Sequence, residues 1–211
     1  MPNKVLPPSG PGRPKDLVKR QAILEAAKTL FLRNGYDGSS MDAIAAEAGV
    51  SKLTVYSHFT DKETLFAAAV KSKCEEQLPE LLFELSDDAP IEQALLNIGR
   101  SFHGLINSCE SVALHRMMVN LAAQDSKLSK MFYDAGPQRL LEEMQHLLTQ
   151  ANAAGKLRIA NPAGAADQFF CLIKGGANFR LLIGCGEALV GEAAEQHVQE
   201  TVQMFIRAYR P

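Results

Sequence analysis

The chain has 211 residues, 46% of them hydrophobic, which is enough for one large domain or for a small domain joined to a larger one. Its net charge of −2 excludes a uniformly basic nucleic-acid coat, and no apolar run reaches the ~18–20 residues of a membrane span. The charge is uneven, since the first 60 residues hold eight Lys/Arg against five Asp/Glu, which favours contact with a polyanion at that end. No apolar segment follows Met1, so we expect a cytoplasmic protein with no membrane partner.

The first part of the chain changes from a leader to a helix. Five prolines and two glycines in residues 1–14 predict a flexible arm. From residue 16 onward, apolar residues recur at helical spacing, which predicts a helix over about 16–34 that Gly35 ends.

Two short helices are expected next, in the segments MDAIAAEAG and KLTVYSHF. Ser39 and Ser40 are the candidate N-caps of the first and Ser51 that of the second, and Gly49 supplies the positive φ of a sharp turn between them. A capping box that starts at Thr60 then opens a longer helix, which Pro79 should end.

The remaining sequence is also helical in pattern, and no run alternates long enough to predict a strand. The predicted helices cover about 90–107, 111–124, 127–135, 137–154, 161–183 and 191–209. We therefore expect an all-α fold of about nine helices.

The pair of short helices has the pattern of a helix-turn-helix. Alanines keep the first helix narrow, and Val50, Val55 and Phe59 give the second an apolar seam. Its outer face carries short hydrogen-bonding groups, an aromatic hydroxyl and a cation, a set that suits a major groove with phosphate walls. These residues are Lys52, Thr54, Tyr56, Ser57 and His58. The pattern alone is also compatible with a helical hairpin in an ordinary bundle.

Residues 16–70 resemble the TetR family of bacterial repressors. The resemblance rests on the apolar spacing of this stretch and on the segments AGVS, YSHF and KETLF within it. It implies a helix-turn-helix DNA-binding domain over 15–61 and a helical effector-binding and dimerisation domain over 62–211. The C-terminal stretch from SVALHRMMVNLAAQ to ADQFFCLIKG is similar to the AefR-like branch of the family.

The resemblance also implies roles for individual residues on double-stranded operator DNA. Base-facing or groove-edge positions are Ser51, Lys52, Leu53 and Thr54, and phosphate contacts are Tyr56, His58, Lys62, Ser40 and Met41. A bulky Leu53 is a departure from the family pattern, and it either meets a thymine methyl group or only packs. Arg13, in a short basic segment before the first helix, either enters a minor groove or contacts nothing.

The C-terminal two-thirds suggests an effector pocket and a homodimer contact. Methionines and aromatic residues in the middle helices, taken as a set, favour a pocket for a small apolar or amphipathic effector, although any single methionine is more often a plain core residue. The candidates are Phe102, His103, Ile106, Met117, Leu121, Met144, Phe170 and Ile173, with His115 as a further polar group. The last two helices have wide apolar faces, from which we expect a dimer contact at Phe179, Leu182, Val198, Val202 and Phe205.

Other functional classes have weaker support. We find no motif that joins a nucleophile, a base and an orienting group, so we expect neither an enzyme nor a cofactor. The five histidines are scattered, so we expect no metal site. A repressor switched by cysteine oxidation remains the alternative, with Cys109 and Cys185 as its candidates.

Overall fold

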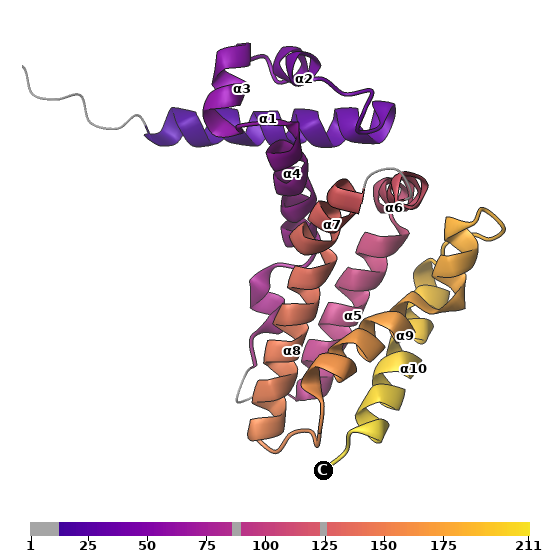
Figure 1. Ribbon diagram of the computed structural model, residues 1–211. Coiled ribbons are helices and arrows are strands. Elements are labelled where there is room, and N and C mark those ends of the chain that lie inside the picture. Colours follow the sequence, from indigo (N-terminus) through magenta and orange to yellow (C-terminus); the bar gives the residue numbers. More distant parts are fainter. Residues whose placement is uncertain (1–12, 86–89, 123–125) are drawn as a thin grey trace, which may run out of the picture. The chain divides into compact units, whose positions relative to one another are not determined.

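The computed structural model describes residues 13–85, 90–122 and 126–211, with the backbone alone given for residues 13–16 and 81. Every regular element in these ranges is a helix (Figure 1). The elements are α1 (Arg13–Asn34), α2 (Met41–Glu47), α3 (Lys52–His58), α4 (Lys62–Gln77), the 3-10 helix η1 (Glu80–Phe83), α5 (Ile91–Asn107), α6 (Cys109–Leu121), α7 (Ser126–Ala135), α8 (Pro137–Ala153), α9 (Pro162–Leu182) and α10 (Gly191–Ala208). The expected all-α fold is confirmed.

The chain forms two compact units, which divide inside α4. The first unit extends to Leu65 and holds α1, α2, α3 and the first turn of α4. The second runs from Phe66 to Pro211 and holds the other helices.

The first helix begins earlier than the sequence pattern predicts. We expected α1 to start near residue 16, whereas it starts at Arg13, so residues 13 and 14 of the expected arm are helical. Pro14 is compatible with this start, because proline is tolerated in a first helical turn, where its missing N–H has no partner to lose. The rest of the expected arm, residues 1–12, lies outside the described residues.

The long helix α1 and the two short helices α2 and α3 enclose a small core in the first unit. α1 packs against α2 and α3, and α2 packs against α3. Ile23, Ile44 and Val55, one from each helix, are fully buried at their meeting point. This burial holds the two short helices on α1, since helices of seven residues are not stable alone.

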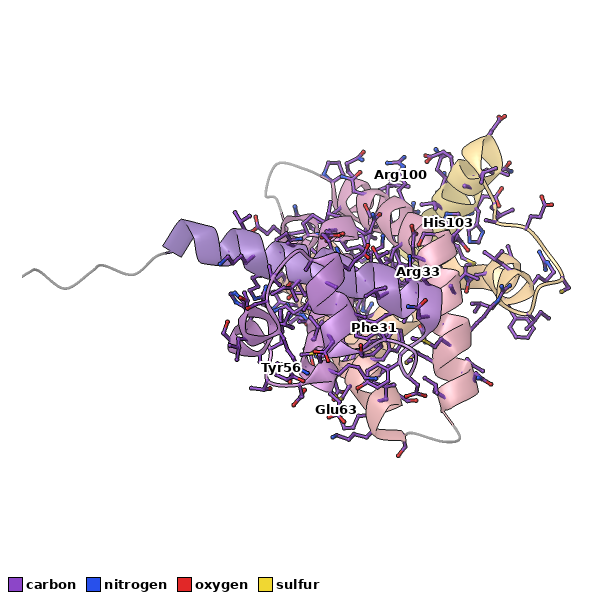
Figure 2. The ribbon with its side chains drawn as sticks, turned by 90° about the horizontal axis from the view of Figure 1, so that it is seen from above. Phe31, Arg33, Tyr56, Glu63, Arg100 and His103 are labelled. Atoms are coloured by element: carbon purple, nitrogen blue, oxygen red, sulfur yellow. The ribbon has the colours of Figure 1, made fainter. Side chains whose placement is uncertain are left out.

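The second unit is a bundle in which α5 packs against α9 and α10, and α8 packs against α9. Gly99 of α5 allows the close approach of α10, because a Cβ there would lie 2.9 Å from Val198 Cγ1. At the surface of the same contact, Arg100 donates to both carboxylate oxygens of Glu195 at 2.9 and 2.6 Å, which lowers the pKa of Glu195 to about 2. Arg100 and His103 both extend from α5 (Figure 2).

Candidate nucleic-acid interface and effector cavity

Two serine caps and one glycine shape the helix-turn-helix. Ser40 Oγ accepts the backbone N–H of Ala43, and Ser51 Oγ accepts that of Thr54, both at 3.1 Å. Gly49, between the helices, has φ of 65°, a conformation that costs glycine little and other residues more. The turn at Gly49 and the cap at Ser51 are confirmed, and Ser40 is the one of the two candidate serines that caps α2. The cap of α4 differs from the prediction, because Asp61 Oδ1, and not Thr60, accepts the backbone N–H of Thr64 at 2.7 Å.

Helix α3 has an outer face that does not pack in the core. Lys52, Leu53, Tyr56 and Ser57 are exposed, and Leu53 is 83% exposed. Tyr56 comes from α3 (Figure 2) and keeps 43% of its surface exposed. Thr54 and His58, at the edge of the same face, are half-buried.

Lys52 has a partner within the protein. Its Nζ lies 2.7 Å from Asp42 Oδ1 and 2.9 Å from Asp42 Oδ2. The hydrogen bond to this carboxylate raises the pKa of Lys52. The ion pair therefore links the N-terminal turns of α2 and α3, and it places one negative charge beside the outer face of α3.

Two residues that we expected to contact DNA, Met41 and Lys62, make contacts within the protein itself. The side chain of Met41 is buried, so it packs in the core and the expected contact for this side chain is wrong. Lys62 Nζ donates to the carbonyl oxygen of Tyr36 at 2.9 Å and lies 4.2 Å from the centre of the Tyr36 ring. This contact ties the start of α4 to the turn after α1.

The second unit contains a cavity of about 150 Å³. Six helices contribute to its wall, namely α4 through Val70, Lys73 and Cys74, α5 through Phe102, Leu105 and Ile106, α6 through Ser111, Leu114 and His115, α7 through Phe132 and Tyr133, α8 through Pro137, Leu140 and Leu141, and α9 through Asp167, Phe170, Cys171 and Lys174. Among the predicted ligand contacts, Phe102, Ile106 and Phe170 line this cavity.

The other five predicted contacts do not line the cavity. Met144 and Ile173 are fully buried in the core, and His103 is buried with its ring 6.0 Å from that of His197. Met117 and Leu121 are half-buried on α6 but are not part of the wall. Helical spacing indicates which side of a helix is buried, but it does not separate packed core from cavity wall, and for this reason Tyr133 and Lys174 were missed.

His115 is a polar group of the cavity wall that neighbouring residues fix in place. Its Nδ1 donates to the carbonyl oxygen of Ser111 at 2.7 Å, and its ring meets the ring of Phe132 edge-on at 5.6 Å. Burial lowers the pKa of His115, and the nearby charge of Lys174 lowers it further. With Nδ1 protonated and bonded, a neutral ring keeps Nε2 as a hydrogen-bond acceptor.

The cysteines are all free, and Cys109, Cys171 and Cys185 are exposed. Cys74, in the cavity wall, is mostly buried, and burial raises the pKa of its thiol to about 11. At neutral pH this sulfur is a thiol, which is the unreactive form.

Helix α9 is broken in the middle. Gly175 has φ of 57° and ψ of −177°, which interrupts the helical backbone, and His197 Nε2 donates to the carbonyl oxygen of Ile173 at 2.9 Å. After the break, the buried Asn178 donates to Asn107 Oδ1 at 3.0 Å. Arg116 of α6 donates to the carbonyl oxygens of Leu181 and Leu182, at 2.7 and 2.8 Å, and so binds the C-terminal end of α9.

The expected dimer residues fall into two groups. Val198, Val202 and Phe205 are buried in the core of their own chain, so their assignment to a dimer surface is wrong. Phe179 is 63% exposed and Leu182 is half-buried. Other large apolar side chains exposed on α9, on α10 and in the connection between the two helices are Leu172, Ile183, Val190 and Met204.

The helix-turn-helix and the cavity together are typical of one class of protein, the DNA-binding transcription factors. A capped helix-turn-helix with an exposed second helix is the DNA-reading element of many transcription factors, and here it continues in sequence into a larger helical unit with an internal cavity. In the ranges that the structure describes, no helix is both long and apolar enough to cross a membrane.

Comparison with known families identifies the member of this class. Residues 23–69 match the family model described as bacterial regulatory proteins, tetR family. Residues 93–211, more than half of the chain, match the model of the C-terminal domain of the AefR-like transcriptional repressor. The chain belongs to the TetR family of transcriptional regulators, which are DNA-binding repressors that act as dimers and are not enzymes.

Individual relatives agree with this assignment. The chain is similar to the uncharacterized HTH-type transcriptional regulator YdeS of Bacillus subtilis, with 28% identity over 149 residues, 70% of this chain and 71% of YdeS. A putative TetR-family regulator from Mesorhizobium loti has a similar structure, with a TM-score of 0.75, 28% identity and coverage of 93% of this chain and 99% of that one. The flavonoid-responsive regulator FrrA has a TM-score of 0.71 and 33% identity, with coverage of 92% of this chain and 97% of FrrA.

Proposed function

We propose that this chain is a repressor that leaves its operator when a small amphipathic molecule binds in the cavity of the second unit. The observation that carries the proposal is the composition of the cavity wall. Its apolar part, which includes Phe102 and Phe170 with ring centres 4.4 Å apart, suits an apolar or aromatic body. The polar part of the wall orients the bound molecule, since the neutral His115 ring accepts a hydrogen bond from a ligand hydroxyl group at Nε2.

Continuity of α4 supports a route from the cavity to the DNA-binding unit. Val70, Lys73 and Cys74 of α4 line the cavity, and the first turn of the same helix belongs to the first unit. A molecule that displaces these residues of the cavity wall therefore acts directly on α4, the helix whose first turn belongs to the DNA-binding unit. It acts only through its different affinities for the two shapes, and a 100-fold preference corresponds to ~2.7 kcal/mol of coupling.

FrrA supports the choice of ligand class, because it is named as flavonoid-responsive and its structure matches that of this chain over 97% of its own length. Flavonoids are aromatic molecules with hydroxyl groups, which fits a wall of rings with a hydrogen-bond acceptor. Two probes of different size, 2-naphthol and naringenin, cover this class.

The proposal is tested by titrating each probe into the dimer, with and without operator DNA, by calorimetry. By reciprocity, operator should weaken the binding of an inducing probe by the same factor by which the probe weakens operator binding. Leu114→Trp should fill the cavity and abolish probe binding. Leu121→Trp is the matched control, because Leu121 is a half-buried leucine on the same helix that does not line the cavity. Equal probe affinity with and without operator would exclude that probe as an inducer.

The redox alternative depends on the exposed cysteines. Its candidates Cys109 and Cys185 are exposed, as is Cys171 of the cavity wall. Cys74, the other cysteine of that wall, has a raised pKa and is therefore a poor thiolate. Release of DNA by peroxide in the absence of any probe, with loss of this response in a variant lacking the exposed cysteines, would replace the effector mechanism with a cysteine switch.

We infer that the dimer contact lies on the exposed apolar surface at the C-terminal end of α9, with Phe179 and the C-cap residue Ile183 as its main contributors. Both are more than half exposed in the single chain. Burial of such side chains against a symmetry mate would remove apolar surface from water on both copies at once.

A further inference from the structure

We propose that Leu53 reads the methyl group of a thymine, and that this apolar contact is the principal sequence-specific contact of helix α3. Leu53 is 83% exposed, so it does not serve the packing of its own unit. An apolar side chain held in this position on a reading helix is recognised by an apolar group in the major groove, and the only such group on the four bases is the C5 methyl of thymine.

The polar neighbours of Leu53 are already engaged within the protein. Ser51 Oγ accepts the N–H of Thr54 and is 2.9 Å from Thr54 Oγ1. Ser57 Oγ donates to the carbonyl oxygen of Thr54 at 2.7 Å, and Lys52 is paired with Asp42. Each of these groups must exchange or share a bond to read a base edge, whereas Leu53 gives up only contact with water.

The size of the effect follows from the size of the group. Removal of one buried methyl-sized group costs ~0.8 kcal/mol, which is about a fourfold loss of affinity per half-site. A dimer on a symmetric operator makes the contact twice, so replacement of the same thymine in both half-sites should weaken binding about 16-fold.

The experiment starts from duplexes that the full-length protein selects from a random library. In the selected duplex, each symmetric pair of thymines is replaced by deoxyuridine, which removes the methyl group and leaves base pairing unchanged. We expect one pair whose replacement weakens the wild type about 16-fold in fluorescence anisotropy. At that position, 5-methylcytosine should bind more tightly than cytosine, because it restores the methyl group.

Two variants assign the effect to Leu53. Leu53→Ala should bind the thymine and deoxyuridine duplexes equally, and it should melt at the wild-type temperature because the side chain is exposed. Leu17→Ala removes another exposed leucine of the same unit, which lies on α1, and should keep the full penalty. The proposal is overturned if no thymine shows a penalty that Leu53→Ala abolishes. It is also overturned if Leu53→Ala leaves the base preference intact and changes the mass of the assembly, since Leu53 would then contact protein.

Discussion

Asp42 and Lys52, ten residues apart in sequence, form an ion pair of 2.7 Å beside the DNA-reading helix. Both side chains are largely exposed, so the pair contributes little to stability. Its effect falls on DNA binding, because the carboxylate partly neutralises the cation that a phosphate or a guanine would otherwise meet. In Asp42→Asn, we expect tighter binding to all duplexes and a slope of log K against log salt that is steeper by about one unit. Asp37→Asn, an exposed acid in the turn before α2, is the control and should change the slope less. A slope identical to that of the wild type in Asp42→Asn would show that Lys52 already contacts DNA with Asp42 in place.

Tyr56 should contribute to affinity without contributing to specificity. Its hydroxyl group is the part that can reach a phosphate, and one hydrogen bond contributes about 0.5–1.5 kcal/mol net. We therefore expect Tyr56→Phe to weaken selected and scrambled duplexes by the same few-fold factor. Competition titrations with both duplexes measure this ratio, and a loss confined to the selected duplex would make Tyr56 a base contact.

Two phenylalanines should respond to substitution in opposite ways. Phe179→Glu should yield folded monomers. Phe179 is exposed in the single chain, so the substitution should not disturb the fold, but the glutamate would place a negative charge in the dimer contact. Phe205→Ala should instead destabilise the fold by about 3–5 kcal/mol, because Phe205 is buried against Phe169 and Tyr209. Light scattering gives the mass, and urea denaturation followed by circular dichroism gives the stability. A dimeric Phe179→Glu variant would place the contact elsewhere.

Two histidines, the buried His103 and the half-buried His115, should make the protein less stable in mild acid. Burial lowers the pKa of His103 and of His115, and the charges of His197 and Lys174 respectively lower them further. The unfolded chain, with a histidine pKa near 6.5, therefore binds more protons than the folded chain as the pH falls through and below that value. Their contribution to stability is complete above pH 6.5 and is lost as the pH falls toward the lowered folded pKa. Each histidine can change the free energy of unfolding by at most ~1.4 kcal/mol per pH unit.

Urea denaturation between pH 7.5 and pH 5 measures this slope. His115→Gln and His103→Gln should each make it shallower, whereas His146→Gln, a substitution on the exposed side of α8, should not. Equal slopes in all four proteins would mean that His103 and His115 are protonated in the folded state at the same pH as in the unfolded state.

Gly175 should not tolerate a side chain. Its φ of 57° is unfavourable for other residues, and a Cβ would lie 3.1 Å from Cε1 of His197. We expect Gly175→Ala to lose ~1–3 kcal/mol of stability, because its φ of 57° and ψ of −177° lie in a region that essentially only glycine adopts. Gly176→Ala is the matched control, because the nearest atom to its Cβ is the mobile end of Arg180 at 3.3 Å. Thermal melts of both variants decide the point, and a wild-type melting temperature in Gly175→Ala would mean that the break in α9 relaxes without cost.

The sequence predicts local features well and partners poorly. Ser51 and Gly49 were predictable because a cap and a left-handed turn depend on the residue itself and its immediate neighbours. The apolar spacing of α10 also predicts correctly that Val198 and Phe205 are buried. It does not indicate what buries them, since the core of one chain and the surface of a second chain require the same side chains.

The same limit applies to the cavity and to α3. Met144 and Phe170 have similar patterns along their helices, yet only Phe170 lines the cavity, because a wall is defined by the space that several helices leave between them. The partner of Lys52 lies on another helix, and its identity depends on the angle at which α2 and α3 cross. Contacts of this kind follow from the assembled unit and not from the spacing within one helix.

The break at Gly175 also divides α9 into a part that lines the cavity and a part that is exposed on the surface. Phe170, Cys171 and Lys174 precede it and line the cavity, whereas Phe179 follows it on the exposed surface. Substitutions before the break can alter what the cavity admits while the surface after the break stays the same. With the proposed dimer contact on that surface and the proposed effector in the cavity, gene duplicates that diverged in this way would detect different molecules and would still assemble with one another, so mixed dimers would carry two kinds of cavity on one operator.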